Sequence, residues 1–239
     1  MYFNGTITYK GVQSSTHSLL ITEVPTIIHS QIRGDTAPIP GKDGDAVSTD
    51  TYRGDAQVRV NFALIKETGN YYEAIRGIRE WLTGTGTLVI GDATDSYYEV
   101  KKVEINTDER IIVNVGTVEV VFTVYPYEFL NSGDTGISGG GTVANSNSKS
   151  CPLYKIVGNG TGTLTVNGNT MDFTVATADE GIYIDTRRHM AYNGKSTPEN
   201  KNGSLTGDYD AIKLVHGNNS IAISSGFTLT TYPKWGYTI

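Results

Sequence analysis

Hydrophobic residues alternate with polar ones in two segments of the first half of the chain. The apolar positions are Val58, Val60, Phe62 and Leu64 in the first segment and Val118, Val120, Phe122 and Val124 in the second. A period of two places every second side chain on the same face of a strand, so both segments are predicted to be strands with one buried face. The second strand is expected to end at Pro126, because proline has no N–H to donate to a sheet.

Between these segments, the apolar period changes from two to that of a helix. The helical stripe comprises Tyr71, Ala74, Ile75, Ile78 and Leu82, and Trp81 widens it. Asn70 is a suitable N-cap, and Gly84 is a suitable terminator just past the end. Gly77 weakens the helix by about 1 kcal/mol. The pattern therefore predicts one amphipathic helix that needs a sheet to cover.

The second half of the chain reads as short strands separated by turns rich in asparagine and glycine. Asn167-Gly168 suits the positive φ angles of a type I′ hairpin turn. A polar turn at 185–188 separates Ile182 and Ile184 from Met190 and Tyr192, and a turn at 217–219 separates a strand over 211–216 from one over 220–223. Strand spacing near ten residues without a helix predicts an antiparallel β-sandwich.

Small and polar residues dominate positions 131–150, and this composition marks the best boundary in the chain. We therefore expect an N-terminal domain over 1–130, a linker over 131–149 and a C-terminal domain over 150–239, although part of the linker can form a short edge strand. Each half has its own apolar strands, so each can bury its own core. The fold class is predicted to be all-β with one helix.

Residue types that carry catalysis or bind metals do not cluster in the sequence. His17, His29, His189 and His216 lie in different segments without metal-ligand spacing, and Cys151 has no second cysteine for zinc or a disulfide. No carboxylate pair of a hydrolase is marked by its position. We expect no enzymatic activity, no catalytic residue, no metal and no cofactor.

The net charge of −6 lies entirely in the first half of the chain. Residues 1–130 contain 17 acidic and 11 basic side chains, whereas residues 131–239 contain eight of each. An acidic surface disfavours specific nucleic-acid binding, because phosphates need cationic partners. Neither a signal peptide nor the roughly 20 apolar residues of a membrane span is visible, so the sequence favours a protein that is not inserted in a membrane.

Residues 37–47, APIPGKDGDAV, have no regular period, two prolines, two glycines and charges of both signs. The stretch is too polar to be part of a hydrophobic core, and its turn-forming residues make it too compact for a simple linker. Proline and glycine favour turns, so this segment is predicted to form a protruding arm. Near the end of the chain, Trp235 and Tyr237 are candidates for stacking on a sugar ring.

The order of these features resembles one protein family. An N-terminal MYFNG strand precedes the PGKDG arm, a helix ending in IREWL, the segment GTLVIGDATDSYYEVKKV and a strand closing on VYPYEF. A low-complexity link leads to GNGTGTLTVNG, IYIDT, LVHGNNSIAI and YPKW. This ordered set, which covers essentially the whole chain, resembles the distal tail (Dit) proteins of bacteriophages and prophages with long, non-contractile (siphovirus-type) tails.

The resemblance implies a virion structural protein at the tail tip, or baseplate, that is made in the cytoplasm of the host bacterium. It implies a homo-oligomer, a hexameric ring, either single or stacked as two rings, around the channel for DNA ejection. The N-terminal β-sandwich or split-barrel domain builds this ring, and a galectin-like C-terminal sandwich lies outside it. The implied partners are the tail tube protein, the tail-tip (tail-associated) protein and a receptor-binding protein.

Within this family, an acidic first domain suits a channel through which DNA passes without specific binding. Ring closure is a head-to-tail contact that needs two different complementary patches. The candidate intersubunit or interlayer arm comprises Pro40, Gly41, Lys42, Asp43, Gly44 and Asp45. Two alternatives remain open: a carbohydrate-binding module for host attachment, with Trp235 or Tyr237 as the stacking residue, and a wall-degrading hydrolase.

Overall fold

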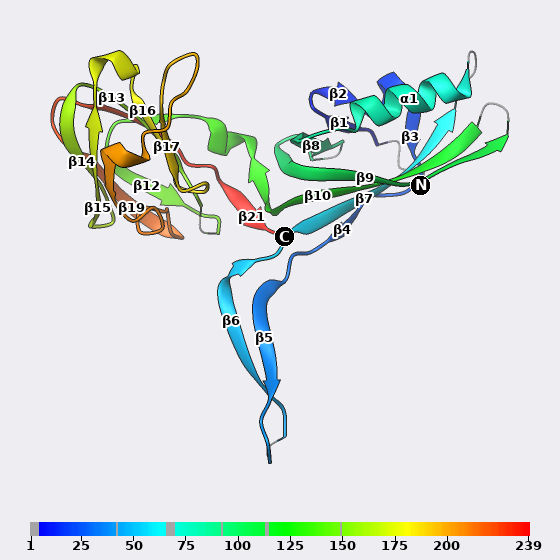
Figure 1. The fold of residues 1–239 in the computed structure, drawn as a ribbon, viewed down its shortest axis with the longest axis horizontal. Helices are drawn as coiled ribbons and strands as arrows, with labels where there is room; N and C mark the ends of the chain where they lie inside the picture. The colour runs from blue at the N-terminus through cyan, green and yellow to red at the C-terminus, as the bar shows by residue number, and fades with distance from the viewer. Residues whose placement is uncertain (1–4, 42, 66–69, 92, 113–114, 149) are drawn as a thin grey trace. The chain divides into compact units, whose positions relative to one another are not determined.

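The computed structural model describes residues 5–41, 43–65, 70–91, 93–112, 115–148 and 150–239. It divides into two compact units, one comprising Met1–Glu128 with Thr238–Ile239 and the other Phe129–Tyr237. Strands dominate both units, and the described residues contain one α-helix, α1 (Tyr71–Trp81). The prediction of an all-β fold with one helix is therefore confirmed (Figure 1).

The first unit is built on one curled sheet (Figure 1). The strands of this sheet are β1 (Ile7–Tyr9), β2 (Val12–Gln13), β3 (Leu19–Ile21), β4 (Thr26–Ile28), β7 (Ala56–Ile65), β8 (Gly86–Ile90), β9 (Ser96–Ile112), β10 (Val115–Leu130) and β21 (Gly236–Thr238). The last residues of β10 and the first two of β21 belong to the second unit. The order is β2-β1-β8-β9-β10-β7-β3, with β4 beside β7 and β21 beside β10. A 3₁₀ turn, η1 (Ser14–His17), precedes β3.

The two alternating segments form adjacent strands, β7 and β10, which pair antiparallel from Ala56↔Val124 to Ile65↔Val115. All eight predicted inward positions are buried. The end predicted at Pro126 is wrong, because β10 continues to Leu130. Pro126 lies beyond the pairing with β7, which ends at Val124, and its carbonyl accepts a hydrogen bond from Ile239 N at 3.2 Å.

Helix α1 covers the core of the first sheet with the predicted stripe. The Asn70 side chain accepts a hydrogen bond from Tyr72 N at 2.9 Å, which confirms the N-cap, and Gly84 has a φ of +73° just past the end. Trp81 donates its Nε1 hydrogen to Tyr9 O at 3.2 Å, and its ring stacks on His17 with a centroid distance of 4.7 Å. These contacts join the last turn of the helix to β1 and to η1.

The second unit is a sandwich of two five-stranded antiparallel sheets, as the strand pattern predicted. One sheet contains β11 (Ile137–Ser138), β20 (Thr228–Tyr232), β13 (Leu153–Val157), β16 (Ile182–Asp185) and β17 (Met190–Asn193), in that order. The other contains β12 (Gly141–Asn145), β19 (Gly217–Ile223), β14 (Gly160–Val166), β15 (Asn169–Val175) and β18 (Leu205–Gly207). Three short 3₁₀ turns are η2 (Asn131–Asp134), η3 (Thr177–Asp179) and η4 (Asn202–Ser204).

Two details of the second unit differ from the sequence prediction. Residues 211–216 do not form a strand beside β19; instead Leu214 makes a single bridge with Ser150, and β19 pairs with β12 and β14. In the hairpin β16–β17, Ala191 and Asn193 are buried, whereas Met190 and Tyr192 are half-buried. The Asn167-Gly168 turn is confirmed, with φ angles of +51° and +85°.

The segment 131–149, expected to be a linker, belongs to the second unit. It contains β11 and β12, which complete the edges of the two sheets by pairing with β20 and β19. Small residues do not prevent pairing, because the ladder uses backbone groups alone. At the other end, Ile239 is buried in the core of the first unit and its carbonyl accepts a hydrogen bond from Ser30 N at 3.1 Å. The second unit therefore starts at Phe129 and ends at Tyr237.

Acid should weaken the second unit through Asp179, a buried carboxylate at the end of η3. It accepts hydrogen bonds from Lys201 Nζ at 2.7 Å and Ala176 N at 3.1 Å, and these bonds lower the pKa of Asp179 below its ordinary value of 3.8. A lowered folded-state pKa contributes stability above pH 4, and this stability is lost as the pH falls below 4. We expect Asp179→Asn to flatten that part of the pH profile in urea unfolding; an equally steep profile would contradict this role.

Candidate functional site

The predicted arm is a hairpin of two strands, β5 (Ile32–Pro38) and β6 (Asp45–Arg53), which pair with each other and with no other described strand (Figure 1). Every residue of β5 is exposed. An isolated two-stranded hairpin is marginally stable in water. The described side chains of β6 from Asp45 to Ser48 are exposed as well, so this end of the hairpin has surface that another molecule can cover.

The candidate arm residues lie at the tip of this hairpin. Gly41 and Gly44 have φ angles of +76° and +86°, which only glycine adopts without strain, so they form the turn that reverses the chain. Pro40, Asp43 and Asp45 are exposed, whereas Lys42 lies outside the described residues.

Neither Asp43 nor Asp45 has a side-chain partner in the described part of the chain. The tip also presents apolar side chains, because Ile39 is 38% exposed and Val47 is 64% exposed. Carboxylates beside exposed aliphatic groups suit a partner surface that is both cationic and apolar.

A pocket of about 370 Å³ lies between α1 and the end of β9. It is lined by Tyr71, Tyr72, Ile75, Arg76, Arg79, Asp108 and Arg110. Arg79 is paired with Asp108 at 2.5 Å, and the Arg110 guanidinium lies 5.3 Å from the centre of the Tyr71 ring. We call this site the arginine pocket. Its three guanidinium groups against one carboxylate make it cationic within an acidic unit.

Sequence reasoning did not identify the arginine pocket. Arg76 and Arg79 are three positions apart, so one helix brings them to neighbouring places, and this spacing is a detectable signal. Arg110 gives no such signal, because it is brought to the site only by the pairing of β9 in the sheet. Burial raises the pKa of Tyr71, which keeps its hydroxyl protonated, and the hydroxyl donates to Glu109 O at 3.3 Å.

The two candidate sugar-stacking residues differ in their environment. Trp235 is half-buried and packs against the core of the second unit, whereas Tyr237 is 50% exposed in β21. No ring contact joins them within the described residues. The structure therefore does not combine Trp235 and Tyr237 into one aromatic platform.

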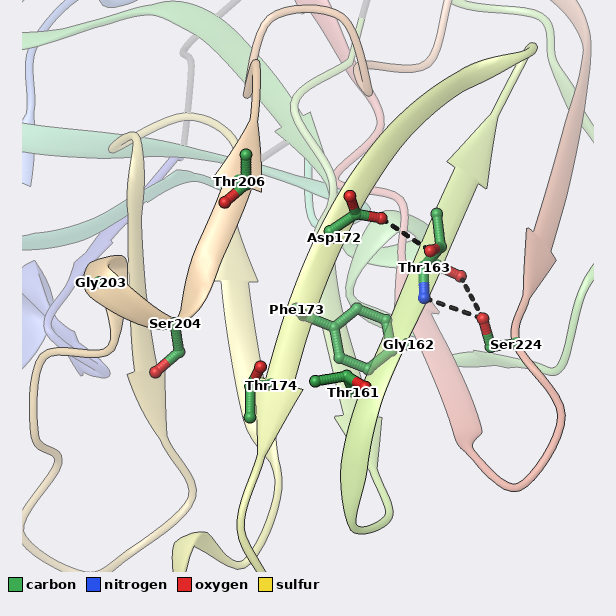
Figure 2. Close-up of a pocket in the computed structure, with 10 residues that line it drawn as sticks. All are labelled: Thr161, Gly162, Thr163, Asp172, Phe173, Thr174, Gly203, Ser204, Thr206 and Ser224. Atoms are coloured by element: carbon green, nitrogen blue, oxygen red, sulfur yellow. Dashed lines mark hydrogen bonds between the residues drawn. The ribbon is translucent and has the colours of Figure 1, made fainter.

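A polar groove of about 490 Å³ lies over β14, β15 and β18 of the second unit (Figure 2). Most of its side chains carry hydroxyl groups. The Thr163 hydroxyl donates a hydrogen bond to the Asp172 carboxylate at 2.7 Å, and Ser224 Oγ accepts one from Thr163 N at 2.8 Å. The aromatic residue in its lining, Phe173, is only 2% exposed. The groove therefore lacks an exposed ring on which a sugar could stack.

The remaining candidates for chemistry are dispersed. Among the described residues, no group of three or more His, Cys, Asp or Glu side chains is placed to hold a metal ion. His17 stacks on Trp81, and burial lowers its pKa; His189 stacks on Tyr209 with a centroid distance of 5.5 Å. Cys151 is half-buried. In the described parts of the chain, no helix is long and apolar enough to span a bilayer.

The comparison with solved structures identifies this architecture. No protein-family model and no curated protein sequence matches the chain. The chain is similar in fold to a crystal structure of the Dit (gp 19.1) protein of phage SPP1, described as a paradigm of the hub adsorption apparatus in phages that infect Gram-positive bacteria. The TM-score is 0.68 at 13% sequence identity, over 95% of this chain and 97% of that chain. The chain therefore has the fold of a phage distal tail protein along nearly its whole length.

Proposed function

We propose that this protein is a Dit-family structural hub of a phage or prophage tail tip. Six copies form a ring that connects the tail tube to the tail-tip and host-adhesion proteins and surrounds the channel for DNA ejection. The observation that supports this proposal is the agreement of fold with the Dit protein of phage SPP1, which extends over both units and nearly both whole chains.

Two properties of the first unit support a role in ring assembly. Its exposed hairpin arm offers a surface that a neighbouring subunit can cover, and the candidate contact residues are Pro40, Gly41 and Asp43–Asp45, with Lys42 between them in the sequence. Its net charge of −6 disfavours attachment of DNA to a channel wall. DNA therefore passes through without specific binding, and the virion tail tip is the place of action.

The second unit fits a docking role for other baseplate proteins, including a receptor-binding protein. No observation favours the two alternative functions. The polar groove offers no exposed aromatic ring on which a sugar could stack. We propose that the protein acts without catalysis and without a cofactor.

Negative-stain imaging of the purified chain, followed by a DNA filter-binding assay, tests this function. We expect annular particles with an open centre and no retention of double-stranded DNA at physiological salt. Compact single-chain particles at every concentration, or DNA retention as strong as that of a basic DNA-binding protein, would contradict the proposal.

A further inference from the structure

The arginine pocket and the tip of the arm carry complementary features. The pocket brings together three guanidinium groups, one carboxylate and the exposed ring of Tyr72. The tip presents the carboxylates of Asp43 and Asp45 next to the exposed Ile39 and Val47. Arginine binds carboxylates through paired N–H donors, and its flat face also stacks on aromatic rings. The pocket therefore offers cations and an aromatic ring, and the tip offers the carboxylates and aliphatic side chains that such groups bind.

Within the pocket, Arg76 is the cation best placed to accept a new partner. Arg79 already pairs with Asp108, and Arg110 lies over the rings of Tyr71 and Tyr72. The side chain of Arg76 is exposed and makes no ion pair or hydrogen bond with any described residue. A carboxylate that enters the pocket would thus find the guanidinium of Arg76 free to bind it, whereas those of Arg79 and Arg110 already contact Asp108 and the two tyrosine rings.

The two surfaces lie at opposite ends of the first sheet. The arm leads into β7 at Ala56, whereas the pocket lies near the other end of β7, where Gly116 of β10 pairs with Leu64 and approaches Tyr71. Ten strand residues separate these ends, or roughly 30 Å at 3.3 Å per residue. Different complementary surfaces at opposite ends of one subunit are the arrangement that head-to-tail association requires.

We propose that the arginine pocket of one copy receives the hairpin tip of a second copy, with Asp43 or Asp45 paired to Arg76 and with Ile39 or Val47 against Tyr72. This inference names the acceptor surface for the arm and rests on the proposed ring assembly. The contact is heterologous, because it joins two different surfaces. Repeated contacts of this kind form a closed ring when the rotation between neighbouring subunits is a whole fraction of a full turn.

Charge reversal tests the pairing with matched variants. We expect Arg76→Glu and Asp43→Lys each to weaken assembly at least 10-fold by mass photometry, and the doubly substituted chain to recover most of this loss. Lys102→Glu serves as the control, because Lys102 is an exposed cation of the same unit that pairs with Glu104 at 2.7 Å, away from the arginine pocket. It should leave assembly unchanged.

The results separate this inference from the proposed function. If the wild type forms rings and both single variants assemble as well as it does, the pocket is not the acceptor, although the ring function stands. If the doubly substituted chain assembles even less well than either single variant, the pairing of Asp43 with Arg76 would also be overturned. If the wild type forms no ring at all, the proposed function fails, and the inference fails with it.

Disulfide trapping distinguishes a neighbour's arm from the chain's own arm. In a Cys151→Ser background, Asp43→Cys combined with Tyr72→Cys should give covalent dimers and a ladder of larger species on oxidation, and neither single cysteine variant should give the ladder. A cross-linked product that migrates only as a single chain would show that the arm folds back on its own pocket, and this would overturn the proposal.

Discussion

Replacing residues 39–44 with Asn-Gly is expected to convert the proposed ring into single chains without loss of folding. Pro38 pairs with Asp45, so a two-residue turn can join these positions in the register that the hairpin already has. The change removes Ile39 and Asp43 from the tip, and both are exposed. The cores of both units are untouched, so the free energy of unfolding should stay within about 0.5 kcal/mol of the wild-type value.

The size of this effect follows from the repetition of the contact. If loss of the tip weakens each interface by about 2 kcal/mol, each contact becomes roughly 30-fold weaker. A closed ring contains as many copies of the contact as it has subunits, so the penalties multiply. Light scattering on the shortened chain provides the measurement. A ring that assembles at the wild-type concentration would show that the tip is a free loop rather than a contact.

Trp81→Ala should have the largest effect on folding, a loss of about 3–5 kcal/mol in the stability of the first unit. The ring of Trp81 is 8% exposed, and it packs edge-on to Tyr9 with a centroid distance of 6.1 Å. The substitution leaves a cavity at the end of α1 and removes the hydrogen bond to Tyr9 O. Urea unfolding followed by circular dichroism measures the loss.

A neighbouring substitution supplies the control for Trp81→Ala. Glu80 lies on the same turn of α1 with its side chain exposed, so Glu80→Ala should shift the unfolding free energy by no more than about 0.5 kcal/mol. Trp235 lies in the second unit, and its fluorescence therefore reports on that unit while the first is perturbed. An unchanged urea midpoint for Trp81→Ala would contradict the packing described for the helix.

The sequence predicted those parts of the fold in which a local period decides the structure. The alternation over 57–65 requires one face of a strand to be buried, and the stripe around Ile75 and Ile78 requires one face of a helix to be buried. The apolar face of each element is buried as expected. The Asn167-Gly168 turn was predictable because its backbone conformation depends on the two residue types alone. The order of motifs along the chain also predicted the fold that the structural comparison found.

Features that depend on distant partners were not predictable in the same way. Pro126 looked like the end of a strand, because nothing local shows that the chain's last residue, Ile239, donates its N–H to the proline carbonyl there. The segment 131–149 looked like a linker, because its small residues carry no apolar period even though their backbone groups complete two sheets. The arginine pocket joins Arg110 to α1 only through the fold of the sheet.

The mass of the assembled protein in solution tests the ring most directly. Native mass spectrometry of the purified chain should give about 155 kDa for one ring of six 25.8 kDa subunits, or about 310 kDa for two stacked rings. A mass of 25.8 kDa across the whole concentration range, even after mixing with the tail tube and tail-tip proteins of the same virion, would contradict the account.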